Sequence, residues 1–193
     1  TIIAAILRAA GYRVGEYTSP HLQHVNERIH VDGQPISDAG LDALLEGLDE
    51  ARQQWAAGLD DFVPIDRVLT YFELMTAAAF VHFSRQNLDV VVMEVGMGGR
   101  LDATNVVDPV VTAITSVGMD HMDQLGDDLG SIAGEKAGII KPGRPVVTGA
   151  MEPEALRVVR AIAHDKGAPI LAHEEAWRVD LGRDGVFSWS FDG

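Results

Sequence analysis

Cysteine is absent from the 193-residue sequence, which excludes disulfide bridges and thiolate metal sites. Basic residues are also scarce, because 15 Lys and Arg against 29 Asp and Glu give a formal net charge of −14. That balance argues against a nucleic-acid partner, since the phosphate backbone attracts Lys and Arg. It does not exclude an anionic small molecule, because the field at one site can differ from the field of the whole protein.

Long apolar runs are missing too. No stretch approaches the roughly 20 residues that a membrane-spanning helix needs, and the N-terminus has no signal-peptide pattern. The sequence therefore predicts a cytoplasmic protein without a membrane partner. The apolar fraction of 47% is enough for a core, and the length suits one domain over residues 1–193, which we expect to be a monomer. The chain starts at Thr1 rather than Met, so we expect its true start to lie upstream.

Helices and strands alternate along the chain. Apolar positions at helical spacing predict helices at Thr1–Ala10, after Ser37, at Tyr71–Arg85, Ser131–Ile139 and Pro153–Lys166. Extended segments are predicted at Tyr12–Tyr17, Val25–Val31, Leu88–Val95, Val110–Val117, Pro145–Thr148 and Pro169–Ala172. Trp177–Leu181 and Val186–Phe191 flank a Gly-rich turn and predict an antiparallel hairpin. This order predicts an α/β fold with a mostly parallel sheet and helices on both faces.

Polar side chains follow three of the predicted strands. Ser19 and His21 follow the first, Glu94 ends an apolar β-branched run, and Asp120 and His121 follow the next strand. Ligands of open α/β sheets bind at the carboxyl ends of the strands, so these groups are expected at one edge. Oxygen ligands suit Mg²⁺, and a histidine nitrogen makes Mn²⁺ a plausible substitute.

Each of these residues also has a purely structural interpretation. Ser19 before Pro20 fits a simple turn, and His121 fits a hydrogen-bonded buried imidazole. Glu94 is harder to explain in this way, because a carboxylate that ends a buried apolar strand is costly without a partner or a metal. The sequence therefore favours a functional role for Glu94.

The loop after Glu94 is rich in glycine. Gly96, Gly98 and Gly99 would let the backbone come close to a ligand, although glycine-rich turns after strands are common. Arg100 could hold a carboxylate or phosphate in bidentate fashion, or could simply contact Asp102 within the loop. Further on, Lys136 sits among small and apolar neighbours, unlike an ordinary solvated lysine.

Six motifs occur in a fixed order, and together they resemble the N-terminal domain of folylpolyglutamate synthase and the bifunctional dihydrofolate synthase of the Mur ligase superfamily. They are Tyr17–Leu22, Asn26–Ile29, Leu69–Glu73, Glu94–Asn105, Thr115-Ser116 with Asp120-His121 and Leu125-Gly126, and Glu135–Pro142. The resemblance implies a P-loop NTPase-like Mur ligase central domain. It also implies a reaction in which ATP phosphorylates a carboxylate and the amine of glutamate attacks the acyl phosphate.

The resemblance also implies roles for individual residues. It assigns Ser19, Glu94 and His121 to the metal sites, with Mg²⁺ as the metal, and Lys136 to a carbamylated lysine that acts with His121 in catalysis. Gly96, Gly98 and Gly99 would approach the nucleotide. The residues implied near the dihydropteroate or folate substrate are Pro20, His21, Phe72, Arg100 and Asp102, with Thr70–Glu73 as the pterin-side segment.

Two parts of the family pattern are missing from the chain. The phosphate-binding loop, Gly-x-x-Gly-Lys-Ser/Thr in form, does not occur, and nothing follows residue 193 to match the glutamate-binding domain. We therefore expect a fragment that ligates no glutamate by itself. Two alternatives remain at this stage: another Mur-type amino-acid ligase, and a non-catalytic pterin- or nucleotide-binding module.

Overall fold

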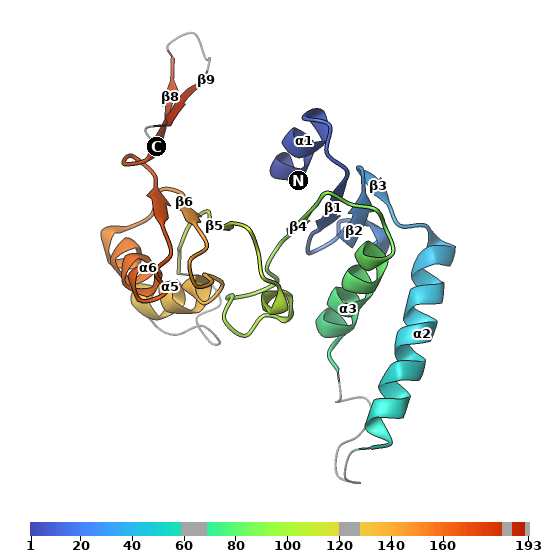
Figure 1. The fold of residues 1–193 in the computed structure, drawn as a ribbon. Helices are drawn as coiled ribbons and strands as arrows, with labels where there is room; N and C mark the ends of the chain where they lie inside the picture. Colours follow the sequence, from blue (N-terminus) through green and yellow to red (C-terminus); the bar gives the residue numbers. More distant parts are fainter. Residues whose placement is uncertain (59–68, 120–127, 183–186, 192–193) are drawn as a thin grey trace. The chain divides into compact units, whose positions relative to one another are not determined.

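The computed structural model describes residues 1–58, 69–119, 128–182 and 187–191. The chain forms two compact units, Thr1–Gly96 and Met97–Gly193, and the ribbon of each can be followed in Figure 1. Among the described residues, no helix combines the length and the apolar character that crossing a bilayer requires.

The first unit is built on a four-stranded sheet. Strand β1 (Val14–Tyr17) pairs in parallel with β4 (Val90–Met93) and antiparallel with β2 (Ile29–Val31), and β2 pairs antiparallel with β3 (Gln34–Pro35). The resulting order is β3-β2-β1-β4. Tyr17 is aligned with Met93, so the carboxyl ends of β1 and β4 lie at the same edge of the sheet.

Two helices of this unit begin where the sequence predicts them to begin. Helix α2 (Asp38–Ala56) starts after Ser37, whose hydroxyl accepts the Gly40 N–H at 3.1 Å. Helix α3 (Tyr71–Ser84) starts with a capping box, in which Thr70 and Glu73 each accept the other's backbone N–H. Side-chain caps satisfy the free N–H groups of a first turn, so both predictions are confirmed.

Helices cover both faces of β1. Successive side chains of a strand point to opposite faces, so neighbouring residues of β1 contact different helices. On one face, a Cβ on Gly15 would lie within 3.1 Å of the Phe83 ring of α3. On the other, the buried Glu16 forms an ion pair of 3.4 Å with Arg8 of α1 (Ile2–Ala9). The main core of the unit joins β1 and β2 to α2 and α3, and its buried members include Tyr17, Ile29, Leu41, Leu44, Met75 and Phe83.

The second unit holds a parallel sheet of three strands in the order β5-β6-β7. These are β5 (Thr112–Ile114), β6 (Val146–Thr148) and β7 (Ile170–Ala172), and helices α5 (Leu129–Ala137) and α6 (Pro153–Asp165) pack on their core. An antiparallel hairpin follows, formed by β8 (Trp177–Leu181) and β9 (Phe187–Phe191). The α/β class, the parallel strands and the C-terminal hairpin confirm the fold predicted from the sequence (Figure 1).

Two segments differ from the sequence prediction. Residues Val25–Arg28 form a 3-10 turn, η1, rather than an extended piece, because the Glu27 carboxylate gathers backbone N–H groups of the preceding loop. Strand β4 is not covered on both faces, since Val91 is 38% exposed. Within the described residues β4 pairs only with β1, and an edge position of this kind cannot be deduced from the apolar run itself.

Candidate functional site

Ser19 and Glu94 meet at the carboxyl edge of the first sheet. The parallel pairing continues past the strands, since the Glu94 N–H donates to the Tyr17 carbonyl at 2.9 Å. The Ser19 N–H then donates to Oε2 of Glu94 at 2.8 Å. The strand-end rule predicted that these two residues lie together, and they do.

Glu94 is an exposed residue, so the expectation that it is a costly buried carboxylate is wrong. Strand β4 ends at Met93, and Glu94 is the first residue of the loop beyond it, where water reaches the carboxylate. Any case for a functional role of Glu94 therefore depends on its position beside Ser19, and not on the cost of burying its charge.

The loop after Ser19 is fixed by a single carboxylate. Glu27 accepts backbone hydrogen bonds from Leu22, Gln23 and His24 at 2.7, 3.0 and 2.8 Å. These bonds, that from Leu22 foremost, hold the pKa of Glu27 below its usual value. Pro20, joined to Ser19 by a cis peptide bond, is exposed, whereas His21 is half-buried. The loop thus has a defined shape, with Ser19 at its start.

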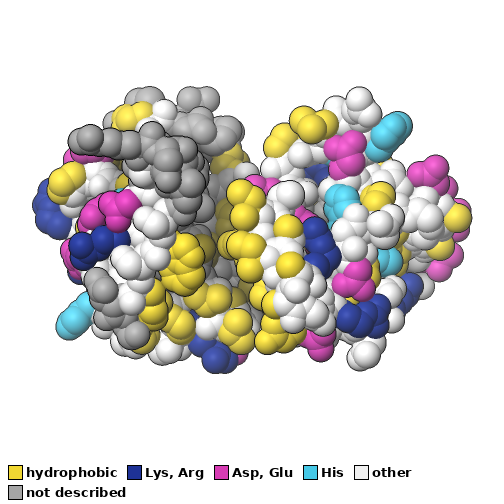
Figure 2. Space-filling model, turned by 90° about the horizontal axis from the view of Figure 1, so that it is seen from above, with side chains coloured by type: hydrophobic (Ala, Val, Ile, Leu, Met, Phe, Trp, Pro, Cys, Tyr) yellow, Lys and Arg dark blue, Asp and Glu magenta, His cyan; other side chains and the backbone are white. Residues whose placement is uncertain are grey.

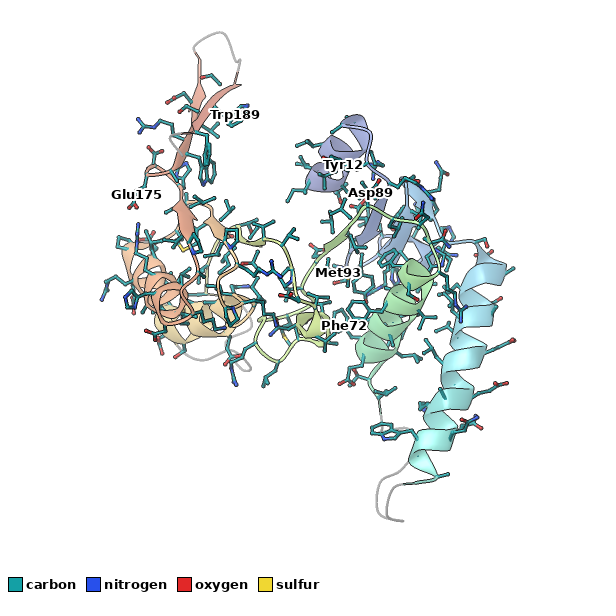
Figure 3. The ribbon with its side chains drawn as sticks, viewed as in Figure 1. Tyr12, Phe72, Asp89, Met93, Glu175 and Trp189 are labelled. Carbon is teal, nitrogen blue, oxygen red and sulfur yellow. The ribbon has the colours of Figure 1, made fainter. Side chains whose placement is uncertain are left out.

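Phe72 connects helix α3 to the glycine loop. Its ring lies 6.2 Å from that of Tyr17, centroid to centroid. A Cβ added to Gly96 would lie only 2.3 to 2.8 Å from three carbons of the Phe72 ring. Figure 3 labels Phe72 at the start of α3 and Met93 at the end of β4, and both pack against the core of this unit. The structure thus gives Gly96 a packing reason to be glycine, in addition to the ligand approach expected from the sequence.

The second unit contains the rest of the glycine loop. Gly98 and Gly99 are buried, and Gly98 has a φ of 65°, which glycine adopts without strain. A Cβ on Gly99 would lie 2.9 Å from the carbonyl oxygens of both Glu135 and Lys136, in α5. These two glycines let the loop backbone lie directly against the end of α5.

Arg100 is anchored to the same helix. Its N–H donates to the Glu135 carbonyl at 2.8 Å, and its guanidinium donates to Oε1 of Glu135 at 3.0 and 2.9 Å. The sequence offered a contact with Asp102 as the structural alternative, and the carboxylate that the structure pairs with Arg100 is Glu135. Asp102 accepts N–H groups from Thr104 at 2.9 Å and Met97 at 3.0 Å, and caps the 3-10 turn η3 (Ala103–Val106).

Lys136 follows Glu135 on α5 and is half-buried. Within the ranges that the structure covers, its ammonium group makes no hydrogen bond or ion pair, which leaves Nζ available for chemistry. The remaining site residue predicted from the sequence, His121, lies outside the described residues, as does Asp120.

Magnesium was implied by the family resemblance, and the donors can be tested for it. Among the described residues, no cluster of three or more His, Asp and Glu could hold a metal ion. However, Mg²⁺ usually takes only one or two carboxylates and completes its shell with waters and substrate phosphates. Glu94 and the neighbouring Ser19 hydroxyl supply oxygen ligands of that kind, so the residues present fit Mg²⁺.

Parallel strand pairs packed with helices, with polar groups beyond their carboxyl ends, define an α/β class of domain. The Mur ligase middle domain matches residues 53–171, and the chain belongs to this family. It is 46% identical over 178 residues to the dihydrofolate synthase/folylpolyglutamate synthase of Bacillus subtilis, a match that covers 90% of this chain and 39% of that protein. The resemblance read from the six motifs is thereby confirmed.

Solved structures agree with this relationship. An FPGS–AMPPCP complex is 40% identical with a TM-score of 0.90, over 98% of this chain and 47% of that one. An Escherichia coli FolC complex with DHPP and ADP is also 40% identical, with a TM-score of 0.86, over 98% of this chain and 42% of that one. The chain spans less than half the length of the relatives it matches.

Proposed function

We propose that this chain is part of an ATP-dependent ligase that joins L-glutamate to the carboxylate of dihydropteroate, of a folate, or of both. The observation that carries the proposal is the hydrogen bond from the Ser19 backbone N–H to Glu94, which brings Ser19 and the Glu94 carboxylate together at the strand ends. The relatives support it, because they are dihydrofolate and folylpolyglutamate synthases, one of them solved with ADP.

The chemistry begins with a poor electrophile. A carboxylate resists attack by an amine, and transfer of the γ-phosphoryl group of ATP gives an acyl phosphate with a good leaving group. The amine of glutamate then displaces phosphate and forms the amide. Phosphoryl transfer requires mainly positioning and charge neutralisation, and a bound Mg²⁺ would supply the neutralisation.

We assign the metal to the first unit. Ser19 and Glu94 would hold Mg²⁺, with Mn²⁺ as a substitute. The family resemblance adds His121 as a ligand, a residue that lies outside the described residues. Glu94 has an oxygen for this purpose, because within the described residues only its Oε2 accepts a hydrogen bond. Gly98 and Gly99 would bring the loop backbone close to the nucleotide.

The substrate residues follow from the same proposal. Pro20, His21 and Phe72 of the first unit are proposed as pterin-side residues, and the family resemblance adds Arg100 and Asp102 of the second unit as substrate residues. The pairing with Glu135 gives Arg100 an anchoring role as well. Lys136 would act as a carbamylated lysine: after its ammonium group loses a proton, the amine would add CO₂ with loss of a second proton, and the resulting carbamate would offer oxygen ligands. We further propose that both units belong to one ligase domain, active as a monomer in the cytoplasm.

The test is a ligation assay on the whole protein that carries this chain. Dihydropteroate and tetrahydrofolate are supplied separately with Mg-ATP and glutamate, and the glutamylated product is identified by mass. We expect product with at least one acid, and ADP release that requires both the acid and glutamate. If neither dihydropteroate nor tetrahydrofolate is turned over, the folate assignment is rejected.

A further inference from the structure

Arg28 is a buried cation whose charge has no carboxylate partner among the described residues. The residue is 8% exposed and is the last residue of η1, which follows the loop that begins at Ser19. Its Nε donates to Nδ1 of His21 at 2.8 Å, and its guanidinium carbon lies 5.4 Å from the centre of the Tyr71 ring. In the part of the chain that the structure describes, no ion pair involves Arg28. Buried charges in proteins are normally paired.

Two carboxylates that lie close in sequence to Arg28 and to Tyr71 accept hydrogen bonds from other groups. Glu27, the preceding residue, accepts three backbone N–H groups of the loop. Glu73, two residues after Tyr71, accepts from Thr70. The attraction to the Tyr71 ring compensates only part of the charge. Among the described residues, the Arg28 guanidinium therefore keeps a charge that no ion pair compensates.

The remaining donors of this pair point to an anionic ligand. Arg28 uses Nε on His21, so the fork of N–H groups on its two terminal nitrogens stays open. Among the described residues, the side-chain atoms that are both fully buried and without a hydrogen-bond partner belong to His30, Thr148 and Trp177. The two terminal nitrogens of Arg28 are not among them, so solvent reaches the fork. Because Nδ1 of His21 accepts a hydrogen bond, the neutral imidazole carries its proton on Nε2. The two side chains thus present donors only.

We propose that the Arg28 guanidinium, held in place by His21 and Tyr71, is a binding site for an oxyanion of the substrate. The planar fork of arginine matches a carboxylate or a phosphate group with two parallel hydrogen bonds. The identity of the ligand rests on the proposed function, which supplies a carboxylate on the pteroate side and phosphates on ATP. The site itself rests on burial and hydrogen bonding within the first unit.

The first experiment probes the anion site without any substrate. The whole protein is labelled with ¹⁵N-arginine and titrated with acetate, and separately with inorganic phosphate, at constant ionic strength. Arg28→Met assigns the Arg28 Nε–H signal. Arg13, an exposed arginine that already faces Asp32 at 3.4 Å, is the internal control. We expect the Arg28 signal to shift at about tenfold lower anion concentration than the Arg13 signal, because its fork is free and partly desolvated. Equal responses would overturn the proposal.

The second experiment identifies the source of the oxyanion. Affinities of wild type, Arg28→Met and Arg28→Lys are measured for dihydropteroate, for its methyl ester and for ADP. We expect Arg28→Met to weaken the binding of one oxyanion ligand, dihydropteroate or ADP, by about tenfold to a hundredfold, and Arg28→Lys to weaken it less. The neutral ester should bind all three proteins alike. Equal losses for the acid and the ester would show that Arg28 only shapes the loop, and would overturn the proposal.

The two claims fail separately. If acetate or phosphate shifts the Arg28 signal while the whole protein ligates neither folate acid, the anion site stands and the proposed function falls. If ligation occurs and Arg28 responds to neither anion, the proposed function stands and the anion site falls. Should Arg28→Met fail to fold, Arg28→Lys still separates charge from fork geometry.

Discussion

The backbone N–H of Ser19 donates a hydrogen bond of 2.8 Å to Oε2 of Glu94. The bond joins the loops that leave β1 and β4, and it orients the carboxylate from one side only. Both residues come from segments 75 positions apart, which the parallel pairing of β1 and β4 brings to one edge. Their proximity is the geometric basis for proposing a cation site here.

Replacing Glu94 with Gln should abolish metal-dependent turnover of the whole protein without unfolding it. The amide keeps the shape and an oxygen for Ser19, but loses the charge that binds a divalent cation. We expect Mn²⁺ affinity, measured by electron paramagnetic resonance, to fall at least about tenfold. Glu46→Gln, at an exposed position of α2, should leave it unchanged. Undiminished Mn²⁺ binding by Glu94→Gln would remove the metal role.

Gly138 should not tolerate alanine. A Cβ there would lie 2.3 Å from Cβ and 2.5 Å from Cα of Arg100, so the loop would have to move away from α5 at a cost of about 1–3 kcal/mol. Gly134 lies within α5, whereas Gly138 is the C-cap of that helix. Nothing lies within 4 Å of a Cβ on Gly134, and Gly134→Ala should stabilise the protein by about 0.5–1 kcal/mol. Denaturant unfolding measures both. Equal effects would mean that the loop does not rest on α5 in solution.

Gly96→Ala tests the contact with Phe72. The added methyl would overlap the ring, and we expect a loss of about 1–3 kcal/mol in unfolding free energy. The matched control is Gly47→Ala in α2, where nothing lies within 4 Å and alanine should stabilise by up to about 1 kcal/mol. If the double variant Gly96→Ala with Phe72→Ala loses more than the sum of the two single changes, the steric explanation is wrong.

The start of α3 should make stability depend on pH. Hydrogen bonds from Thr70, first from its backbone N–H and then from its hydroxyl, hold the pKa of Glu73 below the usual 4.5. A lowered folded-state pKa stabilises above the unfolded value and loses this contribution as pH falls through the folded value. The stability difference between wild type and Glu73→Gln should therefore shrink below about pH 4.5. A difference that stays constant from pH 6 to 3 would contradict the cap.

Local chemistry allowed the sequence to predict the helix starts. Ser37 and Thr70 cap helices through side chains that act within four residues, so their effect is visible in the sequence alone. The convergence of Ser19 and Glu94 was also predictable, because parallel strands end at a common edge. These features need no knowledge of distant contacts.

Non-local packing decided the rest. The exposure of Val91 depends on which elements cover β4, and that of Glu94 depends on where β4 ends. An apolar run looks the same whether or not its faces are covered. The reason for Gly96 is a ring from α3, and the partner of Arg100 is Glu135, 35 residues away. Hydrophobic side chains also lie on the surface that Figure 2 shows. Ile2 and Ile6 of α1 are 77% and 62% exposed, and helical spacing alone does not tell whether an apolar face is covered.

The most direct test of the central claim follows an oxygen atom. Dihydropteroate or tetrahydrofolate, labelled with ¹⁸O in the reacting carboxylate, is incubated with the whole protein, Mg-ATP and glutamate, and the released phosphate is examined by mass spectrometry. Amide formation through an acyl phosphate transfers one ¹⁸O to phosphate for each product molecule. Product formed with unlabelled phosphate would contradict the account.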